Sequence, residues 1–363
     1  PPSPSGLRTC KMVVATGFFD GVHTGHRHVI KQLVEAAAAR GDESMVVTFW
    51  PHPRNVLQKE AHLLRLLTTL AEKKHMLMEL GVDRVEVLEF TREFSRMTTQ
   101  EYLLMLKERF GARSVLIGYD NRMGCDAMDA DHVAQIAAQE GLEVLRTEMV
   151  PSEQGYAVSS TKIRQKIEEG DMQAVSAMLG YDYSLLGVVV AGKRLGRTIG
   201  FPTANMQLYE PLKLVPGNGV YFVRVKTLGR EWFGMCNVGC RPTIGEGNAR
   251  TIETNIFGFE EDIYGLDIEV TFLQKIRDEV KFASLEDLKM QLTKDRNSCQ
   301  TVIPSVVEGS KLYHNMLTLK LLRENPEFVI EKLAVKNFDA KEIVEKINAL
   351  DVNKRALQVE LDG

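Results

Sequence analysis

The chain has few cysteines, and their number and spacing argue against two kinds of stabilised fold. The five are Cys10, Cys125, Cys236, Cys240 and Cys299. A small, odd-numbered set is poorly suited to a disulfide framework and fits a reducing compartment. Cys236 and Cys240 have no second Cys or Cys/His pair at zinc spacing, so a structural zinc site is not expected.

The sequence also lacks a long apolar run and an excess of one charge. None of its apolar stretches approaches the roughly 20 residues that span a bilayer. Residues 1–5 (PPSPS) have neither the basic nor the apolar part of a signal peptide. The formal net charge of -4 gives no electrostatic reason to expect nucleic acid or an anionic membrane as the main partner. We expect a soluble, cytoplasmic protein, clipped at its start because Met is missing there.

The first half of the chain alternates short apolar strands with amphipathic helices. The predicted strands are Val13–Phe19, Met45–Trp50, Arg84–Leu88, Ser114–Ile117 and Val144–Glu148. The predicted helices are His26–Arg40, Leu70–Leu80, Thr99–Phe110 and Ala130–Gln139. This alternation predicts a doubly wound α/β fold with a parallel sheet, which binds ligands at the carboxyl ends of its strands.

From about Tyr181 the pattern changes to strands separated by turns that contain Gly and Pro. The predicted strands are Leu185–Ala191, Val220–Thr227, Glu231–Val238, Thr251–Phe257 and Asp267–Leu273. They predict an antiparallel sheet or small β-barrel. A helix over Leu285–Leu292, capped by Ser284, closes it.

Beyond the barrel, Asn297–Asn315 shows no clear periodicity and reads as a connector, and Met316–Asp362 has the pattern of a charged helical tail. We therefore divide the chain into residues 1–183, 184–296, 297–315 and 316–363.

One phosphate motif follows the first strand. Gly17 to His26 reads GFFDGVHTGH, and a helix is predicted to begin at its end. His23 and His26 are three residues apart and share a helix face. The helix start favours an anion between them, while Gly21 and Gly25 allow close backbone approach. An ATP triphosphate fits this turn, although a tight turn with capped polar residues is the alternative.

A second cluster opens the helix after the last parallel strand. Ser159 to Arg164 reads SSTKIR, whose hydroxyls could simply cap that helix. Together with the two histidines, we interpret the cluster as a second clamp on the same triphosphate, in which Arg164 binds phosphate oxygens.

The β-region carries a basic, glycine-rich stretch, GKRLGRTIGFPTAN, from Gly192 to Asn205. Glycines let backbone N–H groups face a phosphate, and Thr203 and Asn205 offer oxygens to Mg²⁺. Glu253 is a carboxylate in a strand-like stretch and could take a proton from an attacking hydroxyl. A solvated hairpin tip and a solvent-facing carboxylate are the alternatives.

The first half resembles the FMN adenylyltransferase domain of bacterial bifunctional flavin enzymes, within the nucleotidylyltransferase superfamily. The likeness rests on GFFDGVHTGH, TFWPHP from Thr48, IGYDNRMG from Ile117 and SSTKIR, in that order. It implies that His23 and His26 are catalytic. His28 would point away from the face that His23 and His26 share, so we expect a surface role for it, and the role of His52 is left open. The implied ATP site consists of Gly17, Asp20, Gly25, His26, Asp120, Ser160, Thr161 and Arg164.

The β-region resembles the riboflavin kinase domain, through GKRLGRTIGFPTAN, NGVYFV from Asn218, NVGCRPT from Asn237 and DIYG from Asp262. The resemblance implies a six-stranded barrel, with Mg²⁺ at Thr203 and Asn205 and Glu253 as the base for the ribityl 5′-hydroxyl. It implies a flavin contact at Arg277. The implied ATP site consists of Gly192, Lys193, Gly196, Arg197, Gly200, Thr203 and Asn205.

The tail from Met316 resembles the opening of seryl-tRNA synthetase, at MLTLKLLRENPE, Phe338–Asp339 and Leu350–Asp362. Without a catalytic core, aminoacylation is not expected. Our hypothesis is read-through or misjoining of neighbouring genes, which native peptides spanning Asn297–Met316 would contradict. An unrelated amphipathic tail is the alternative.

Together the motifs predict two reactions, phosphorylation of riboflavin to FMN and adenylylation of FMN to FAD with release of pyrophosphate. ATP is the co-substrate and Mg²⁺ the expected cofactor. One rival is an adenylyltransferase for another phosphorylated acceptor, with a β-domain that only binds. The other is a tRNA-binding protein that uses the tail, which the negative net charge disfavours.

Overall fold

The computed structural model describes residues 11–57, 65–118, 122–147, 158–192, 195–241 and 249–314. The chain forms two compact units, Pro1–Lys289 and Met290–Gly363. The tail from Met316, which was predicted to be helical, lies outside the described residues.

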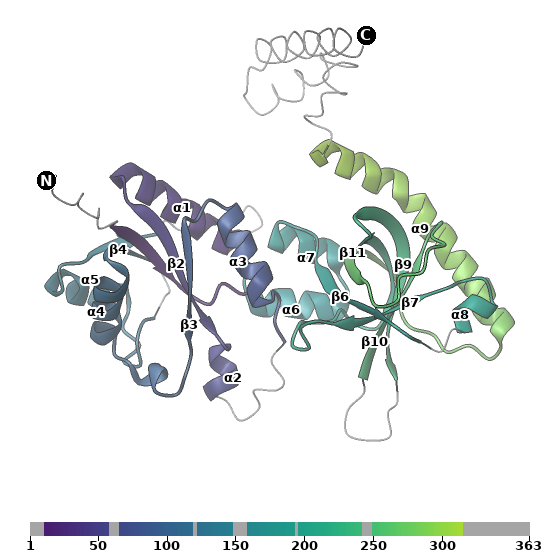
Figure 1. Ribbon diagram of the computed structural model, residues 1–363, viewed down its shortest axis with the longest axis horizontal. Helices are drawn as coiled ribbons and strands as arrows, with labels where there is room; N and C mark the ends of the chain where they lie inside the picture. Colours follow the sequence, from purple (N-terminus) through teal and green to yellow (C-terminus); the bar gives the residue numbers. More distant parts are fainter. Residues whose placement is uncertain are drawn as a thin grey trace, which may run out of the picture. The chain divides into compact units, whose positions relative to one another are not determined.

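A parallel sheet of five strands organises the first half, as predicted, in the order β3-β2-β1-β4-β5 (Figure 1). Its strands are β1 (Met12–Thr16), β2 (Glu43–Trp50), β3 (Arg84–Glu89), β4 (Ala112–Ile117) and β5 (Glu143–Arg146). The order turns back at β1, which lies between β2 and β4. In doubly wound sheets, such a switch point opens a crevice at the carboxyl ends of the strands.

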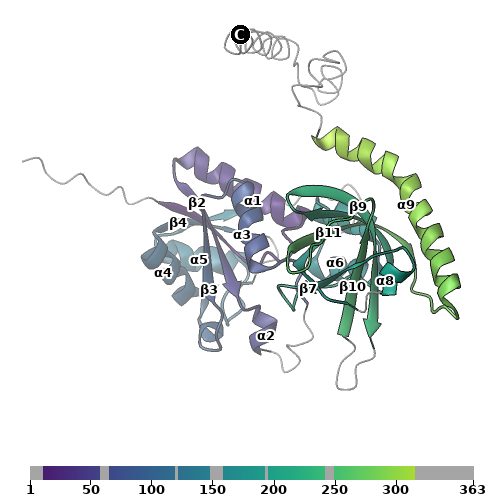
Figure 2. The same cartoon turned by 45° about the vertical axis from the view of Figure 1, so that its right-hand side comes forward.

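Helices cover both faces of this sheet (Figure 2). Helices α1 (Thr24–Arg40) and α3 (Leu70–Glu79) pack on one face, and α4 (Thr99–Phe110) and α5 (Ala130–Gln139) pack on the other. The other helices of this half are α2 (Pro53–Leu57), α6 (Ser160–Glu169) and α7 (Met172–Leu179). The alternating side chains of β1 serve both faces: Val13 packs in one core with Ile30 of α1, and Val14 in the other with Leu103 of α4. Capping boxes start α3 and α4.

A closed antiparallel barrel forms the second half, in the order β10-β7-β6-β11-β8-β9. Its strands are β6 (Ser184–Val190), β7 (Ala204–Leu208), β8 (Gly219–Thr227), β9 (Arg230–Arg241), β10 (Ala249–Ile256) and β11 (Asp267–Arg277). The barrel was predicted, but β7 was not, because its sequence ANMQL has little strand character. The short helix α8 (Leu195–Thr198) precedes β7.

The barrel core also includes residues from the first half of the chain. Ile163 and Ile167 of α6, Leu179 of α7 and Leu67 belong to the same apolar cluster as Tyr221 of β8. Helix α7, which was not predicted from the sequence, therefore packs with the barrel.

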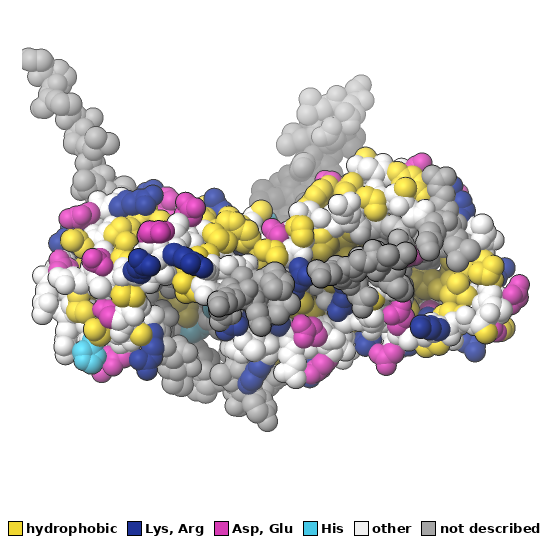
Figure 3. Space-filling model, turned by 90° about the horizontal axis from the view of Figure 1, so that it is seen from below, with side chains coloured by type: hydrophobic (Ala, Val, Ile, Leu, Met, Phe, Trp, Pro, Cys, Tyr) yellow, Lys and Arg dark blue, Asp and Glu magenta, His cyan; other side chains and the backbone are white. Residues whose placement is uncertain are grey.

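Helix α9 (Leu285–His314) begins where predicted but continues past Leu292, through the segment read as a connector. Pro304 and Gly309, which usually interrupt helices, obscured its pattern. Among the helices of the described ranges, none is both long and apolar enough to span a membrane. On the face shown in Figure 3, Lys and Arg side chains are interspersed with Asp and Glu.

Candidate active sites

A cavity of about 350 Å³ lies at the carboxyl ends of β1 and β4. It brings together the two motifs that the sequence reading joined, since residues 17–20 and His26 line it with Ser160, Thr161 and Arg164. His23 and Gly25 stand beside it, at the start of α1, without lining it. His52 and Arg54, which follow β2, also line the cavity. Asp120 lies outside the described residues.

The two histidines of the first motif form a stacked pair. His23 is the N-cap of α1, and its Nδ1 accepts a hydrogen bond from the His26 backbone N at 3.3 Å. The ring centroids are 3.6 Å apart, and the buried His26 Nδ1 has no hydrogen-bond partner among the described residues. Burial lowers the pKa of His23 to about 4 and that of His26 well below its usual value. Both rings are therefore neutral at pH 7, and His26 has a ring nitrogen to spare for a ligand.

The turn between β1 and α1 is held in an unfavourable backbone conformation. Phe19 has φ 51° and Val22 has φ 37°, in the left-handed region that a β-branched residue rarely adopts. Gly21, at φ 81°, could not be replaced easily, since an added Cβ would lie 2.8 Å from Leu67 Cδ1. Such strain persists only where the surroundings enforce it, and it is concentrated at functional sites.

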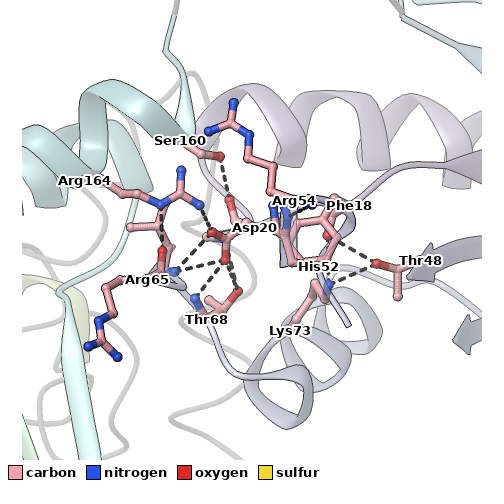
Figure 4. A network of polar contacts seen from close by, with 12 residues as sticks. Phe18, Asp20, Thr48, His52, Arg54, Arg65, Thr68, Lys73, Ser160 and Arg164 are labelled. Carbon is pink, nitrogen blue, oxygen red and sulfur yellow. Dashed lines mark hydrogen bonds and ion pairs between the residues drawn. The ribbon is translucent and has the colours of Figure 1, made fainter. Parts of the chain in front are cut away.

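Asp20 is the group that enforces this turn (Figure 4). Its carboxylate is 3% exposed and accepts hydrogen bonds from Leu67 N at 3.0 Å and Thr68 N at 3.1 Å. It also forms an ion pair with Arg164, whose Nε donates to Arg65 O at 2.8 Å. The carboxylate thus faces protein partners, and it fixes Arg164 at the edge of the cavity.

Ser160, at the start of α6, completes the connection between the two motifs. Its hydroxyl donates to Asp20 O at 3.0 Å, while Ser159 caps the helix. The cluster therefore caps the helix, which was the structural alternative. It also lines the cavity, as a phosphate-binding role requires.

Lys73 of α3 is a charged residue next to this cavity, and it was not predicted from the sequence. It is 2% exposed, and its Nζ donates to Phe18 O at 2.8 Å and Thr48 Oγ1 at 3.0 Å. Burial lowers its pKa to about 8, with Asp20 opposing the shift. The sequence does contain a signal for this residue. Lys73 lies between Leu70 and Leu77 on the apolar stripe of a predicted helix, where a lysine is unusual.

His52 and His28, whose roles the sequence did not fix, lie in different surroundings. The His52 ring centroid is 3.9 Å from that of Phe18, and burial, with Arg164, Arg54 and Lys73 nearby, lowers the His52 pKa to about 3. His52 therefore belongs to the cavity as a neutral ring. His28 does not line the cavity and is hydrogen-bonded to Gln32.

A second cavity, of about 370 Å³, lies on the barrel. Arg197 and Thr203 line it together with Thr254 and Ile256 of β10 and residues 259–264. The segment 259–264 includes most of DIYG, so the structure joins that motif to the glycine-rich loop.

Asn205 and Glu253 do not line this cavity. They face each other across the β7–β10 ladder, and Glu253 also pairs with Asn237 of β9. Because side chains alternate along a strand, Glu253 lies on the face of β10 opposite to Thr254. The predicted kinase residues therefore fall into two groups: Arg197 and Thr203 line the cavity, and Asn205 and Glu253 do not.

The glycine-rich loop needs its glycines for close packing. An added Cβ on Gly196 would lie 2.1 Å from Phe201 O, and one on Gly192 would lie 2.3 Å from Asn205 Nδ2. Gly200 has φ 84°. Lys193 lies outside the described residues. Arg277 ends β11, where its Nη1 donates to Asp278 O at 2.9 Å, and it does not line the cavity.

Comparison with known proteins decides the family. The bifunctional riboflavin kinase/FMN adenylyltransferase of Listeria monocytogenes is 36% identical over 285 residues, which cover 78% of this chain and 90% of that protein. The chain belongs to this family. The protein of the same name from Escherichia coli K12 is 36% identical over 286 residues, 78% of this chain and 90% of its own length.

Family models match each part of the chain. FAD synthetase matches residues 7–162, riboflavin kinase residues 179–303, and the seryl-tRNA synthetase N-terminal domain residues 316–363. The resemblances in all three regions are thus confirmed. A crystal structure from Streptococcus pneumoniae, named as a macrolide-efflux protein, shares the fold with a TM-score of 0.75 and 32% identity, over 81% of this chain and 95% of that one.

Proposed function

We propose that this chain makes FAD in two steps, each at its own cavity. The barrel transfers the γ-phosphoryl group of ATP to riboflavin, giving FMN. The α/β half then joins FMN to the AMP part of a second ATP, giving FAD and pyrophosphate. The observation that carries the proposal is the cavity at β1 and β4, where residues 17–26 and 160–164 meet.

In the adenylyl transfer, an FMN phosphate oxygen attacks the α-phosphorus of ATP, and the bond to the β-phosphate oxygen breaks. No general base is required, because the attacking phosphate is already an anion. The site must instead stabilise the charge that develops on the phosphates. His26 can donate one N–H from a neutral ring, α1 presents its free backbone N–H groups, and Arg164 supplies a fixed positive charge beside the cavity.

In the kinase step, the ribityl 5′-hydroxyl attacks the γ-phosphorus, and Glu253 accepts the hydroxyl proton. Arg197 and Thr203 would hold the nucleotide, and Thr203 is two residues before Asn205, the residue opposite Glu253 on the ladder, so the carboxylate would act at the end of the cavity where Thr203 lies.

Mg²⁺ fits the oxygen donors at the start of β7. Thr203 precedes the strand, and Asn205 lies directly opposite Glu253. Mg²⁺ needs only a few protein oxygens because it keeps several waters. Thr203 and Asn205 would hold it, and when bound it neutralises charge on the ATP phosphates. In the described ranges, no group of three or more His, Cys, Asp and Glu side chains offers an alternative metal site.

The test is to incubate the chain with riboflavin, ATP and Mg²⁺ and to separate FMN and FAD by chromatography, with a parallel reaction that starts from FMN. We expect FMN to appear before FAD in the first reaction and FAD in the second. If FMN never forms while another phosphorylated acceptor is adenylylated, the barrel only binds, and the rival adenylyltransferase is correct.

A further inference from the structure

A short segment of the adenylyltransferase half pairs with the kinase half. Leu66 forms a parallel β-bridge with Lys213, in the connection between β7 and β8. Leu66 N donates to Leu212 O, and Leu214 N donates to Leu66 O, both at 2.8 Å. Arg65 Nη1 donates to Pro211 O, also at 2.8 Å. Four residues of the barrel connection therefore hold the chain just before α3.

A largely buried ion pair strengthens this junction. Lys213 is 5% exposed, and its Nζ pairs with Glu72 in the first turn of α3, whose side chain is 22% exposed. Glu72 Oε2 also accepts a hydrogen bond from Thr69 N at 2.7 Å, in the capping box that starts α3. The Lys213 ammonium lies 5.0 Å from the centre of the Tyr183 ring. A buried ammonium with a carboxylate and an aromatic face is a defined arrangement, not a solvated surface contact.

The same segment holds the strained turn of the adenylyltransferase cavity. Leu67 N and Thr68 N both donate to the Asp20 carboxylate, and Gly21 N donates to Thr68 Oγ1 at 3.0 Å. Asp20 in turn pairs with Arg164. A continuous set of contacts thus runs from Lys213 of the barrel, through residues 65–72, to Asp20 and Arg164.

We infer that Lys213, although it belongs to the kinase half, is a positioning residue for the adenylylation of FMN. It fixes residues 65–72, which set the place of Asp20 and therefore of Arg164 and the turn before α1. The inference rests on the proposed function and adds to it a dependence of the second reaction on the domain that performs the first. These contacts of Lys213 involve neither the residues that line the barrel cavity nor Asn205 and Glu253, so we expect the kinase reaction not to depend on them.

The test replaces Lys213 with Met, which keeps the length of the side chain and removes its charge. We expect kcat/KM of adenylylation for ATP to fall roughly threefold to tenfold, mainly through KM, since about 1 kcal/mol of lost positioning corresponds to that range. FMN formation in the same preparation should stay within about twofold, which also shows that the chain is folded. Lys213→Arg should restore much of the loss.

Glu72→Gln tests the same contact from the other half and can keep the hydrogen bond to Thr69 N. It should reproduce the Lys213→Met effect, and the double variant should lose no more than either single one, because both remove one interaction. Lys226→Met, on the exposed part of β8, is the matched control and should change neither reaction.

Three results would overturn the inference: adenylylation unchanged in both variants, equal losses in both reactions, or additive losses in the double variant. If the unaltered chain makes no FAD from FMN, the proposed function itself is wrong, which is a separate outcome.

Discussion

The charged groups named at the α/β cavity are held by contacts within the protein, whereas the residues assigned to the barrel site are divided between a cavity lining and a strand pair outside that lining. Asp20 and Arg164 are locked together, and Lys73 is held by Phe18 and Thr48. In the barrel, Arg197 and Thr203 face one cavity while Glu253 pairs across the ladder with Asn205.

This difference indicates two ways of preparing a site for ATP. The adenylyltransferase site must stabilise charge without a base, so its work is done by groups fixed before the substrate arrives. The kinase site must bring a hydroxyl, a carboxylate and a nucleotide together, so its rate depends on how the two substrates are oriented at the carboxylate. Substitutions in the two halves should therefore fail in different ways.

Glu253→Gln should have the largest effect. Removing the proposed base should lower FMN formation roughly a hundredfold to ten-thousandfold, while FAD formation from supplied FMN stays unchanged. Product chromatography from each starting flavin measures both. Glu231→Gln, at an exposed carboxylate of β9, is the control. Wild-type FMN formation in Glu253→Gln would show that the carboxylate is only solvent-facing.

His26→Ala should produce the reverse pattern. Losing one donor to the developing phosphate charge should lower FAD formation from FMN by roughly a hundredfold, with FMN formation unchanged. His28→Ala, at a residue that does not line the cavity and is hydrogen-bonded to Gln32, should leave both reactions intact. If the His26 variant loses both products equally, the two sites are not separate as proposed.

Asp20→Asn should lower the stability of the α/β half as well as its activity. The change leaves Arg164 without its buried carboxylate, so the free energy of unfolding should fall by about 2–4 kcal/mol, and FAD formation should fall with it. Urea denaturation measures the first and product chromatography the second. Asp182→Asn breaks a half-exposed pair with Arg224 and should cost less than about 1 kcal/mol. Equal effects of the two changes would contradict the role given to Asp20.

The last prediction concerns pH. Burial lowers the pKa of His23 to about 4, from about 6.5 in the unfolded chain. The unfolded chain therefore takes up this proton first, and stability is lost as pH falls from about 6.5 to about 4, by at most about 1.4 kcal/mol per pH unit. His23→Asn keeps an N-cap acceptor and should lack this part of the slope in denaturation curves. An inflection of wild-type FAD formation at pH 6.5 that the variant abolishes would contradict a neutral His23.

Much of the fold followed from the sequence. The five parallel strands and helices α4 and α5 were predicted closely, because apolar β-branched runs and helical periodicity are local signals. Strand β7 was missed, since ANMQL is stabilised by its barrel neighbours and not by its own composition. The prediction for α9 ended too early because Pro304 and Gly309 hid a helix that continues to His314.

For the two sites, too, some features could be predicted from the sequence and others could not. Sequence alone predicted that the turn at Gly17 and the cluster at Ser159 act together, because residue types and spacing indicate which groups can bind phosphate, and the two motifs do line one cavity. Only the tertiary structure decided that Asp20 faces inward and that Glu253 and Thr254 lie on opposite faces of β10. It also decided that Lys213 reaches α3. Burial, pairing and the side of a strand depend on residues far away in the chain, and no local pattern encodes them.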